Sequence, residues 1–173
     1  YDMRASSPSL VKAAIEGMVK AGIDVINVGL CSTPMFYYAT HHFDVDRGMM
    51  ITASHNPAKF NGVKLCKTNA HPVTFETGIG KVKDFVESGQ EFDIESDPDP
   101  MKVKGTVEDF DNFLGIYIDF MKKFLNVKRP LKVVVDAANG MGGMTAPNVL
   151  EDAVELTSMY CELDGSFPNH EAD

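Results

Sequence analysis

The chain opens with an amphipathic pattern that predicts a helix. Between residues 7 and 20, apolar side chains recur every three or four positions, as the buried face of a helix requires. Ser7 followed by proline favours a helix start with Ser7 as the N-cap, and Gly22 ends the pattern. The β-branched run over residues 23–28 then predicts a strand.

Helical and apolar segments continue to alternate up to residue 86. Thr33-Pro34 is typical of a helix start, and the short apolar runs at 47–51 and 62–66 predict two strands. Apolar residues on one side of the segment 75–86 predict a further helix. Helices and strands that alternate at this spacing favour a layered α/β/α sheet domain.

The composition changes after residue 86. Residues 87–99 are rich in Glu, Asp, Ser and Pro, as in a solvated connector. Further elements are then predicted: a helix over 107–125, a strand buried on both faces at 131–135, a tight glycine-rich turn at 139–143, a helix near 145–153 and a strand near 154–160. We therefore predict an α/β domain over residues 1–127 and the incomplete start of a second, similar α/β domain over residues 128–173.

The composition and charge exclude several classes of protein. Of the 173 residues, 44% are apolar and 24% are charged, which is typical of a globular chain. No apolar run is long enough to span a membrane and no signal-peptide pattern is found, so we expect a cytoplasmic protein without a membrane partner. Residues 1–72 hold 7 basic and 5 acidic residues, whereas residues 73–173 hold 9 and 20. The acidic second part argues against nucleic-acid binding.

Several common site patterns are absent from the sequence. Cys31, Cys66 and Cys161 are an odd number at wide spacing, unlike a disulfide framework or paired zinc ligands. No Gly-x-Ser-x-Gly nucleophile elbow and no P-loop occurs. The turn that contains Gly140-x-Gly142 has Thr145 where a dinucleotide loop needs a third glycine.

The densest group of polar residues is Thr52-Ala53-Ser54-His55-Asn56-Pro57, directly after a predicted strand. Ligands of open α/β sheets bind at such strand ends, where a serine hydroxyl can act as a nucleophile or phosphate acceptor. The alternative is a simple Asx-type turn before Pro57. Lys64 on the next predicted strand favours the functional interpretation, because its positively charged side chain can come back close to Ser54.

Residues 51–64, ITASHNPAKFNGVK, resemble the phosphoserine loop of the α-D-phosphohexomutase superfamily, in the form typical of its phosphomannomutase/phosphoglucomutase branch. Three further segments resemble the same family in the same order. They are the Asp-x-Arg-x-Ser segment at residues 2–6, the Gly-x-x-x-Thr-Pro turn at 29–34, and the start of the second domain, residues 133–140 followed by 164–170.

The resemblance implies a phosphohexomutase. Ser54 would carry the phosphoryl group that moves between the 1- and 6-positions of a hexose phosphate of mannose or glucose, through a hexose 1,6-bisphosphate that also serves as activator. His55 and Lys64 would assist catalysis, and Arg4 and Asn56 would contact the bound phosphates. The Ser54 phosphate would also be a ligand of Mg²⁺, a cation that prefers oxygen.

The chain departs from the family pattern in what it lacks. It has no Asp-Gly-Asp-Gly-Asp-Arg metal loop, no Gly-Glu-x-Ser-Gly sugar loop, and it lacks the first strand of the family's first domain. We therefore expect a fragment that is inactive by itself. The alternative is a non-catalytic domain that binds a sugar phosphate or a partner chain through the same loop. The preferred hexose and the oligomeric state are left open.

Overall fold

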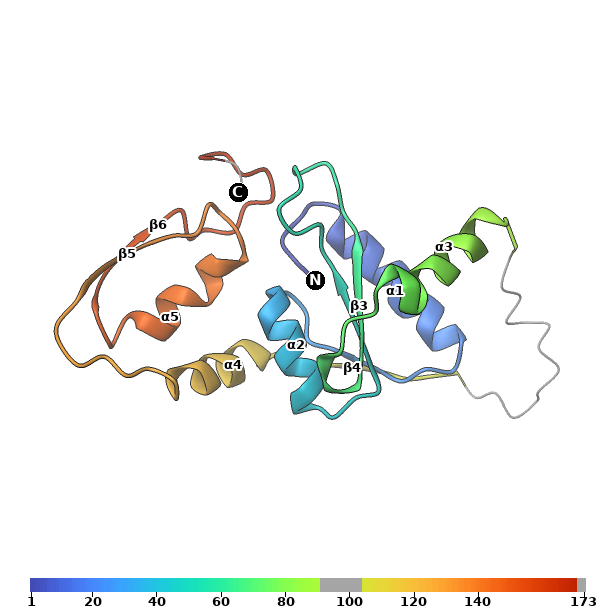
Figure 1. Cartoon of the computed structure of the whole chain (residues 1–173), viewed down its shortest axis with the longest axis horizontal. Coiled ribbons are helices and arrows are strands. Elements are labelled where there is room, and N and C mark those ends of the chain that lie inside the picture. Colours follow the sequence, from blue (N-terminus) through green and yellow to red (C-terminus); the bar gives the residue numbers. More distant parts are fainter. Residues whose placement is uncertain (91–103, 171–173) are drawn as a thin grey trace.

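The computed structural model describes residues 1–90 and 104–170 as an α/β structure with two units (Figure 1). The first unit contains α1 to α3 and β1 to β4, and the second unit contains β5, α5 and β6. Helix α4 (Phe113–Lys122) lies between α2 and α5 and joins the two units. The acidic connector predicted at 87–99 lies mostly outside the described residues.

Each sheet in the described part of the chain has two strands. In the first unit, β1 (Val25–Asn27) pairs in parallel with β4 (Val107–Asp109), and β2 (Arg47–Ile51) pairs in antiparallel fashion with β3 (Val63–Lys67). In the second unit, β5 (Lys132–Asp136) and β6 (Glu155–Met159) are parallel, as in a βαβ unit. The α/β class predicted from the sequence is confirmed.

Helix α1 (Ser7–Lys20) has the predicted bounds, but Ser7 does not cap it. Ser6 occupies the N-cap position without a side-chain cap bond. Ser7 is fully buried, and its hydroxyl donates to Asp2 Oδ1 at 2.7 Å. Gly22 follows the helix with φ of 77°, a left-handed conformation that glycine adopts without strain.

The helix predicted over 107–125 is wrong at its start. Val107–Asp109 forms β4, in register with Val25–Asn27, and Asn27 Nδ2 donates to Asp109 Oδ1 at 2.7 Å. The helix begins only at Phe113. A partner strand about eighty residues earlier in the sequence therefore overrides the local helical spacing.

The main core lies where α2 (Thr33–His42) and α4 pack over β2. Ser32 caps α2, since its Oγ accepts from the backbone N–H of Met35. The rings of Tyr38 and Phe120 stack with centroids 4.1 Å apart. The buried members of this core are Cys31, Met35, Phe36, Ala39, Met50, Cys66, Phe113 and Tyr117.

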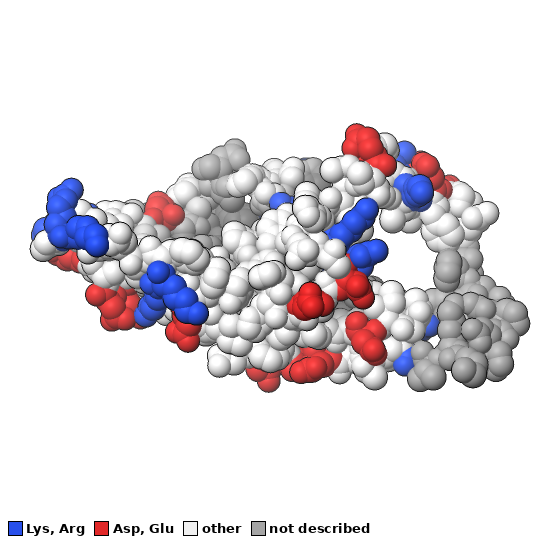
Figure 2. Space-filling model, turned by 60° about the horizontal axis from the view of Figure 1, so that its bottom comes forward, with Lys and Arg blue, Asp and Glu red and all other residues white. Residues whose placement is uncertain are grey.

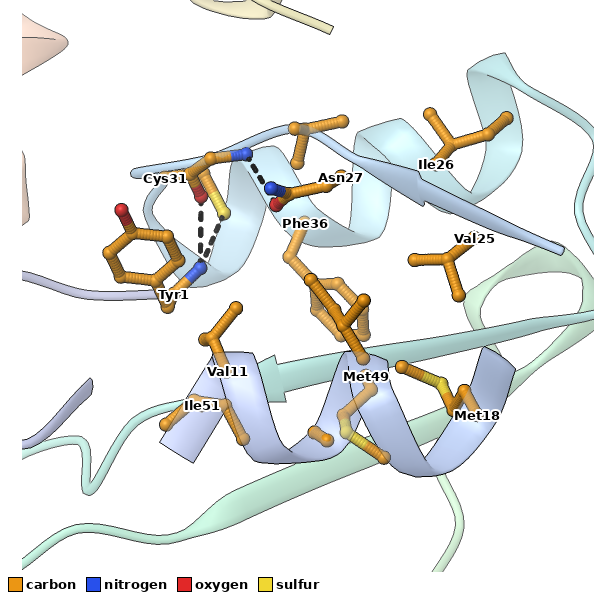
Figure 3. Close-up of a pocket in the computed structure, with 14 residues that line it drawn as sticks. Tyr1, Val11, Met18, Val25, Ile26, Asn27, Cys31, Phe36, Met49 and Ile51 are labelled. Carbon is orange, nitrogen blue, oxygen red and sulfur yellow. Dashed lines mark hydrogen bonds between the residues drawn. The ribbon is translucent and has the colours of Figure 1, made fainter. Parts of the chain in front are cut away.

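An apolar cavity of about 80 Å³ separates β1 from β2 (Figure 3). Val25 and Ile26 line it from β1, and Met49 and Ile51 line it from β2. At its end, the amino group of Tyr1 donates to Gly29 O at 3.0 Å. The two strand pairs of the first unit are therefore separate sheets whose side chains line the same apolar space.

The remaining elements are short. The predicted helix 75–86 consists of a wide turn, Phe75–Ile79, followed by α3 (Gly80–Glu87). A 3₁₀ turn, Thr68–Ala70, follows β3. In the second unit, a 3₁₀ turn, Met141–Met144, leads into α5 (Ala146–Leu150).

The surface carries both signs of charge. On the face shown in Figure 2, Lys and Arg side chains lie among Asp and Glu side chains. Among the helices of residues 1–90 and 104–170, none combines the length and the apolar composition that a bilayer crossing needs.

Candidate active site

The loop between β2 and β3 presents Ser54 to solvent. Thr52 and Ala53 are buried, whereas residues 54–60 are exposed. Ser54 has φ of 55°, a left-handed conformation that is uncommon for serine. Its backbone N–H donates to Thr52 Oγ1 at 3.1 Å, and Asn56 donates to Ala53 O through both its backbone N–H and its side chain. A turn before Pro57 is thus present and carries the serine, but it differs from the predicted Asx-type turn, because the Asn56 side chain donates to a carbonyl oxygen and Thr52 Oγ1 is the side-chain acceptor.

His55 lies within hydrogen-bonding distance of the serine hydroxyl. Ser54 Oγ and His55 Nδ1 are 3.1 Å apart, and both side chains are exposed. This distance allows a proton to pass between the two groups. The structure therefore brings together the first two residues that the sequence proposed for catalysis.

A cavity of about 500 Å³ opens beside this loop, a volume within the range of small-molecule sites. Ser54, His55 and Lys64 all line it. No hydrogen bond or ion pair of the Lys64 ammonium is found within residues 1–90 and 104–170. The N-terminus of α2 lines the cavity through Ser32, Thr33 and Pro34.

The second unit also lines this cavity. Its lining includes Ala138, Gly140 and Met141 from the turn after β5, and Phe167 from the loop after β6. The sequence identified this turn only as a tight connection and did not place it near Ser54. Local pattern holds no signal for such a contact, because it depends on how the two units pack.

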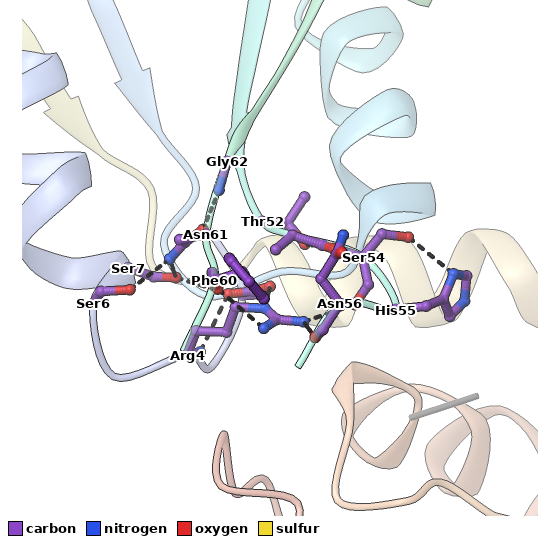
Figure 4. Close-up of polar contacts among 12 residues, drawn as sticks. Arg4, Ser6, Ser7, Thr52, Ser54, His55, Asn56, Phe60, Asn61 and Gly62 are labelled. Carbon is purple, nitrogen blue, oxygen red and sulfur yellow. Dashed lines mark hydrogen bonds and ion pairs between the residues drawn. The ribbon is translucent and has the colours of Figure 1, made fainter. Parts of the chain in front are cut away.

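Arg4 is buried beneath the loop, with 1% of its surface exposed. Its Nε donates to Asp2 Oδ2 at 3.2 Å. Its Nη1 donates to the carbonyl oxygens of Pro57 and Phe60, and its Nη2 donates to those of Ser54 and Asn56 (Figure 4). All five N–H groups of the guanidinium are engaged. A phosphate contact of Arg4, as proposed from the sequence, would require one of these bonds to break.

Asn56 also binds its own loop in this structure. Its side-chain Nδ2 donates to Ala53 O at 2.7 Å. Asp2 holds Arg4 in place on the side away from the loop, and its Oδ1 accepts from Ser7 Oγ and from the backbone N–H of Arg4. Asn61 Nδ2 in turn donates to Ser7 Oγ at 2.9 Å. These polar residues fix the loop, and the sequence analysis assigned no role to Asp2 or Asn61.

The described residues do not by themselves fit a magnesium site. No group of three or more His, Cys, Asp or Glu residues that could hold a metal occurs within them. Ser54 would supply a single oxygen ligand, whereas Mg²⁺ requires near-octahedral oxygen coordination. Because Mg²⁺ usually keeps several waters, a site at Ser54 would combine water ligands with carboxylates that are not clustered within residues 1–90 and 104–170.

Two family models match the chain. Residues 1–92 match the phosphoglucomutase/phosphomannomutase alpha/beta/alpha domain I, and residues 116–173 match domain II of the same family. Together these matches cover most of the chain, and the Ser54 loop lies within the first.

Named relatives and a solved structure agree with these matches. The chain is 35% identical to an Escherichia coli phosphomannomutase and 36% identical to the phosphomannomutase/phosphoglucomutase of Pseudomonas aeruginosa PAO1, over 97% and 99% of its length. It covers 38% and 35% of those proteins. A crystal structure of a phosphoglucomutase/phosphomannomutase family protein from Burkholderia thailandensis superposes with a TM-score of 0.79 at 31% identity, over 98% of this chain and 36% of that one.

Proposed function

Because the chain belongs to the phosphoglucomutase/phosphomannomutase family, we propose that it is the serine-bearing part of a phosphohexomutase. The reaction is transfer of a phosphoryl group between the 1- and 6-positions of a hexose phosphate of mannose or glucose. The observation that carries the proposal is the placement of Ser54 on a fixed, exposed turn, with His55 at 3.1 Å and Lys64 on the same cavity wall.

The proposed chemistry has two transfers through the Ser54 oxygen. In the first, a hexose hydroxyl attacks the phosphorus of phosphorylated Ser54, the new oxygen–phosphorus bond forms and the bond to Ser54 Oγ breaks. The hydroxyl proton passes to the imidazole of His55, and the ammonium of Lys64 donates a proton to Oγ. In the second transfer, the hexose 1,6-bisphosphate has reoriented and gives its other phosphoryl group to Ser54, while Oγ returns its proton to Lys64 and His55 gives its proton to the departing hexose oxygen. Each transfer depends mainly on positioning and on cations near the phosphoryl oxygens.

The cavity supports these roles by its shape and its charge. Its volume of about 500 Å³ suits a ligand the size of a hexose bisphosphate. Lys64 lines this cavity, and its ammonium would balance the phosphoryl oxygens at the end near Ser54. In this proposal, the main role of Arg4 and Asn56 is to hold the loop by hydrogen bonds. Either residue contacts a phosphate only if that contact replaces one of its hydrogen bonds to the loop.

The metal and the activator belong to the same proposal. We propose Mg²⁺ as the cofactor, with the phosphoryl group on Ser54 as one of its ligands, and hexose 1,6-bisphosphate as activator. When bound, a divalent cation would supply positive charge to the transferred oxygens. A cytoplasmic location and a domain boundary at residues 127–128 stay predictions.

The chain spans 35–38% of the length of the two relatives, so activity is proposed for a protein that contains the rest of the family's domains. The chain alone is expected to show no mutase turnover, even with Mg²⁺ and hexose 1,6-bisphosphate. Turnover by the isolated chain would contradict the proposal that further metal ligands lie outside it.

The test of function is hexose-phosphate turnover by the complete protein, measured beside thermal unfolding. If Ser54 is the phosphoryl carrier, Ser54→Ala loses orders of magnitude in rate while stability changes by only about 1 kcal/mol. Ser9→Ala, at another exposed serine, is the control and keeps wild-type turnover. Near wild-type turnover in Ser54→Ala would favour the alternative of a non-catalytic binding domain.

A further inference from the structure

The Ser54 loop has an unusual mode of attachment to the rest of the first unit. Residues 54–60 are exposed and form neither helix nor strand. Four of their carbonyl oxygens accept from the guanidinium of Arg4, at distances between 2.8 and 3.1 Å. Hydrogen bonds to a charged donor are stronger than neutral ones. A single buried side chain therefore holds both ends of this exposed loop.

The conformation of Ser54 depends on this attachment. A serine in the left-handed region is less stable than one in the usual regions, so surrounding contacts must hold it there. Arg4 Nη2 binds the carbonyl of Ser54 at 2.8 Å, directly after that φ angle. The direction of the Ser54 hydroxyl is thus set in part by a residue that does not touch it.

Phe167 of the second unit covers the same guanidinium. Its ring centroid lies 5.6 Å from Arg4 Cζ, within the range of a cation–π contact. Gly165 packs beside it so closely that a Cβ at this position would lie 2.8 Å from Met3 O and 3.0 Å from Arg4 Cα. The loop of the second unit is therefore fitted against the backbone that carries Arg4.

Asn139 anchors the loop that carries Phe167. Asn139 is 5% exposed, and its Nδ2 donates to Glu162 O at 2.9 Å. Its carbonyl accepts from the backbone N–H of Asp164, and its Oδ1 accepts from Asn169 Nδ2 at 2.7 Å. A continuous series of contacts thus runs from the turn after β5, through Phe167 and Arg4, to Ser54.

We propose that Arg4 is a positioning residue for the Ser54 loop and that Phe167 makes this positioning depend on the second unit. When the second unit is in place, the ring of Phe167 stabilises the guanidinium in the orientation that binds the four carbonyls. The meaning of this coupling for phosphoryl transfer rests on the proposed function, but the coupling itself does not.

Amide hydrogen exchange on the full chain tests the proposal. The reporters are the N–H groups of Asn56 and Phe60, which donate to Ala53 O and Pro57 O inside the loop. Their rates are divided by those of α4 amides, so that a change in global stability cancels. In Arg4→Lys, whose ammonium cannot bind four carbonyls, we expect exchange at both reporters to be at least about tenfold faster.

Variants of Phe167 keep the test decisive if Arg4→Lys does not fold. Phe167→Leu removes the ring and is expected to accelerate the two reporters about threefold, whereas Phe167→Tyr keeps a ring face and restores wild-type exchange. Phe75→Ala is the aromatic control, since that side chain is 59% exposed and lies outside both the Ser54 loop and α4. This control should leave the exchange rates of the Asn56 and Phe60 N–H groups at their wild-type values.

Two outcomes would overturn the proposal. One is wild-type exchange of Asn56 and Phe60 in the Phe167→Leu chain, and the other is equal acceleration by Phe167→Leu and Phe167→Tyr. The proposed function fails in a different way, through wild-type protein from cells that never carries phosphate on Ser54. Because the exchange measurement needs no phosphate, the two failures are distinguishable.

Discussion

Replacing Asp2 with asparagine should destabilise the chain strongly. The carboxylate of Asp2 is almost fully buried, and it accepts from Ser7 Oγ at 2.7 Å and from the backbone N–H and Nε of Arg4 at 3.2 Å. The change Asp2→Asn keeps the size of the side chain but removes its charge. It leaves the guanidinium of Arg4, 1% exposed, without a counter-charge.

The size of the effect follows from burial. Removing one partner of a buried ion pair costs about 3–5 kcal/mol. The amide oxygen of asparagine can still accept one or two of the three hydrogen bonds, so we expect the lower end, about 3 kcal/mol. This is a large part of the roughly 5–15 kcal/mol that stabilises a typical domain. For a chain of this length it corresponds to a fall in Tm of about 6–12 °C.

Urea and thermal unfolding followed by circular dichroism measure this loss. Glu155→Gln is the matched control, because it makes the same chemical change in an ion pair to Lys132 whose side chains are 69% and 83% exposed. That change should cost less than about 1 kcal/mol. If Asp2→Asn lowered the free energy of unfolding by less than about 1 kcal/mol, as in the control, the buried Asp2–Arg4 ion pair would not be a major source of stability in the first unit.

Three further predictions concern other parts of the chain. Gly48→Ala should lower unfolding free energy by about 1–3 kcal/mol, because its Cβ would lie 2.6 Å from Phe36 Cε2 in the core; unchanged stability in urea would contradict this packing. In native protein, iodoacetamide should alkylate Cys161 well before Cys31, since burial raises the pKa of the Cys31 thiol; mass spectrometry of peptides measures the order, and equal rates would contradict it. The pKa of Asp136 is lowered, first because its carboxylate accepts a hydrogen bond from the backbone N–H of Ala138. The charged carboxylate therefore stabilises the folded chain above about pH 4, and this stabilisation is lost as the pH falls through the lowered pKa. Urea unfolding at several acid pH values should therefore show a smaller loss in Asp136→Asn than in wild type, and an equal loss would contradict the assignment.

Local patterns predicted most elements of the first unit because those elements are stabilised locally. The helix over residues 7–20 has half-buried apolar residues at three- and four-residue spacing, and the apolar run over 47–51 ends in two buried residues, Met50 and Ile51. Val107–Asp109 was misassigned because its state depends on β1, a partner that is distant in the sequence. The connector at 87–99 was predicted from composition, and residues 91–99 lie outside the described part of the chain.

The candidate site was predictable only where its residues are adjacent in sequence. Ser54 and His55 are neighbours, and Lys64 lies on the next predicted strand, which pairs with the strand before the loop so that Lys64 is opposite Met50. The donors of Arg4 could not be assigned, because the four carbonyls that bind them come together only when the loop folds. Phe167 lies in the family-like segment 164–170, but its φ of 53° and its contact with Arg4 could not be predicted, since both are properties of the folded chain.

Intact-mass analysis of the chain freshly purified from cells tests the central claim most directly. The account predicts that part of the wild-type protein carries the mass of one added phosphoryl group, that fragmentation places this group on Ser54, and that Ser54→Ala protein lacks it. Wild-type protein without any such addition, or the same addition on Ser54→Ala, would contradict the claim that Ser54 carries the phosphoryl group.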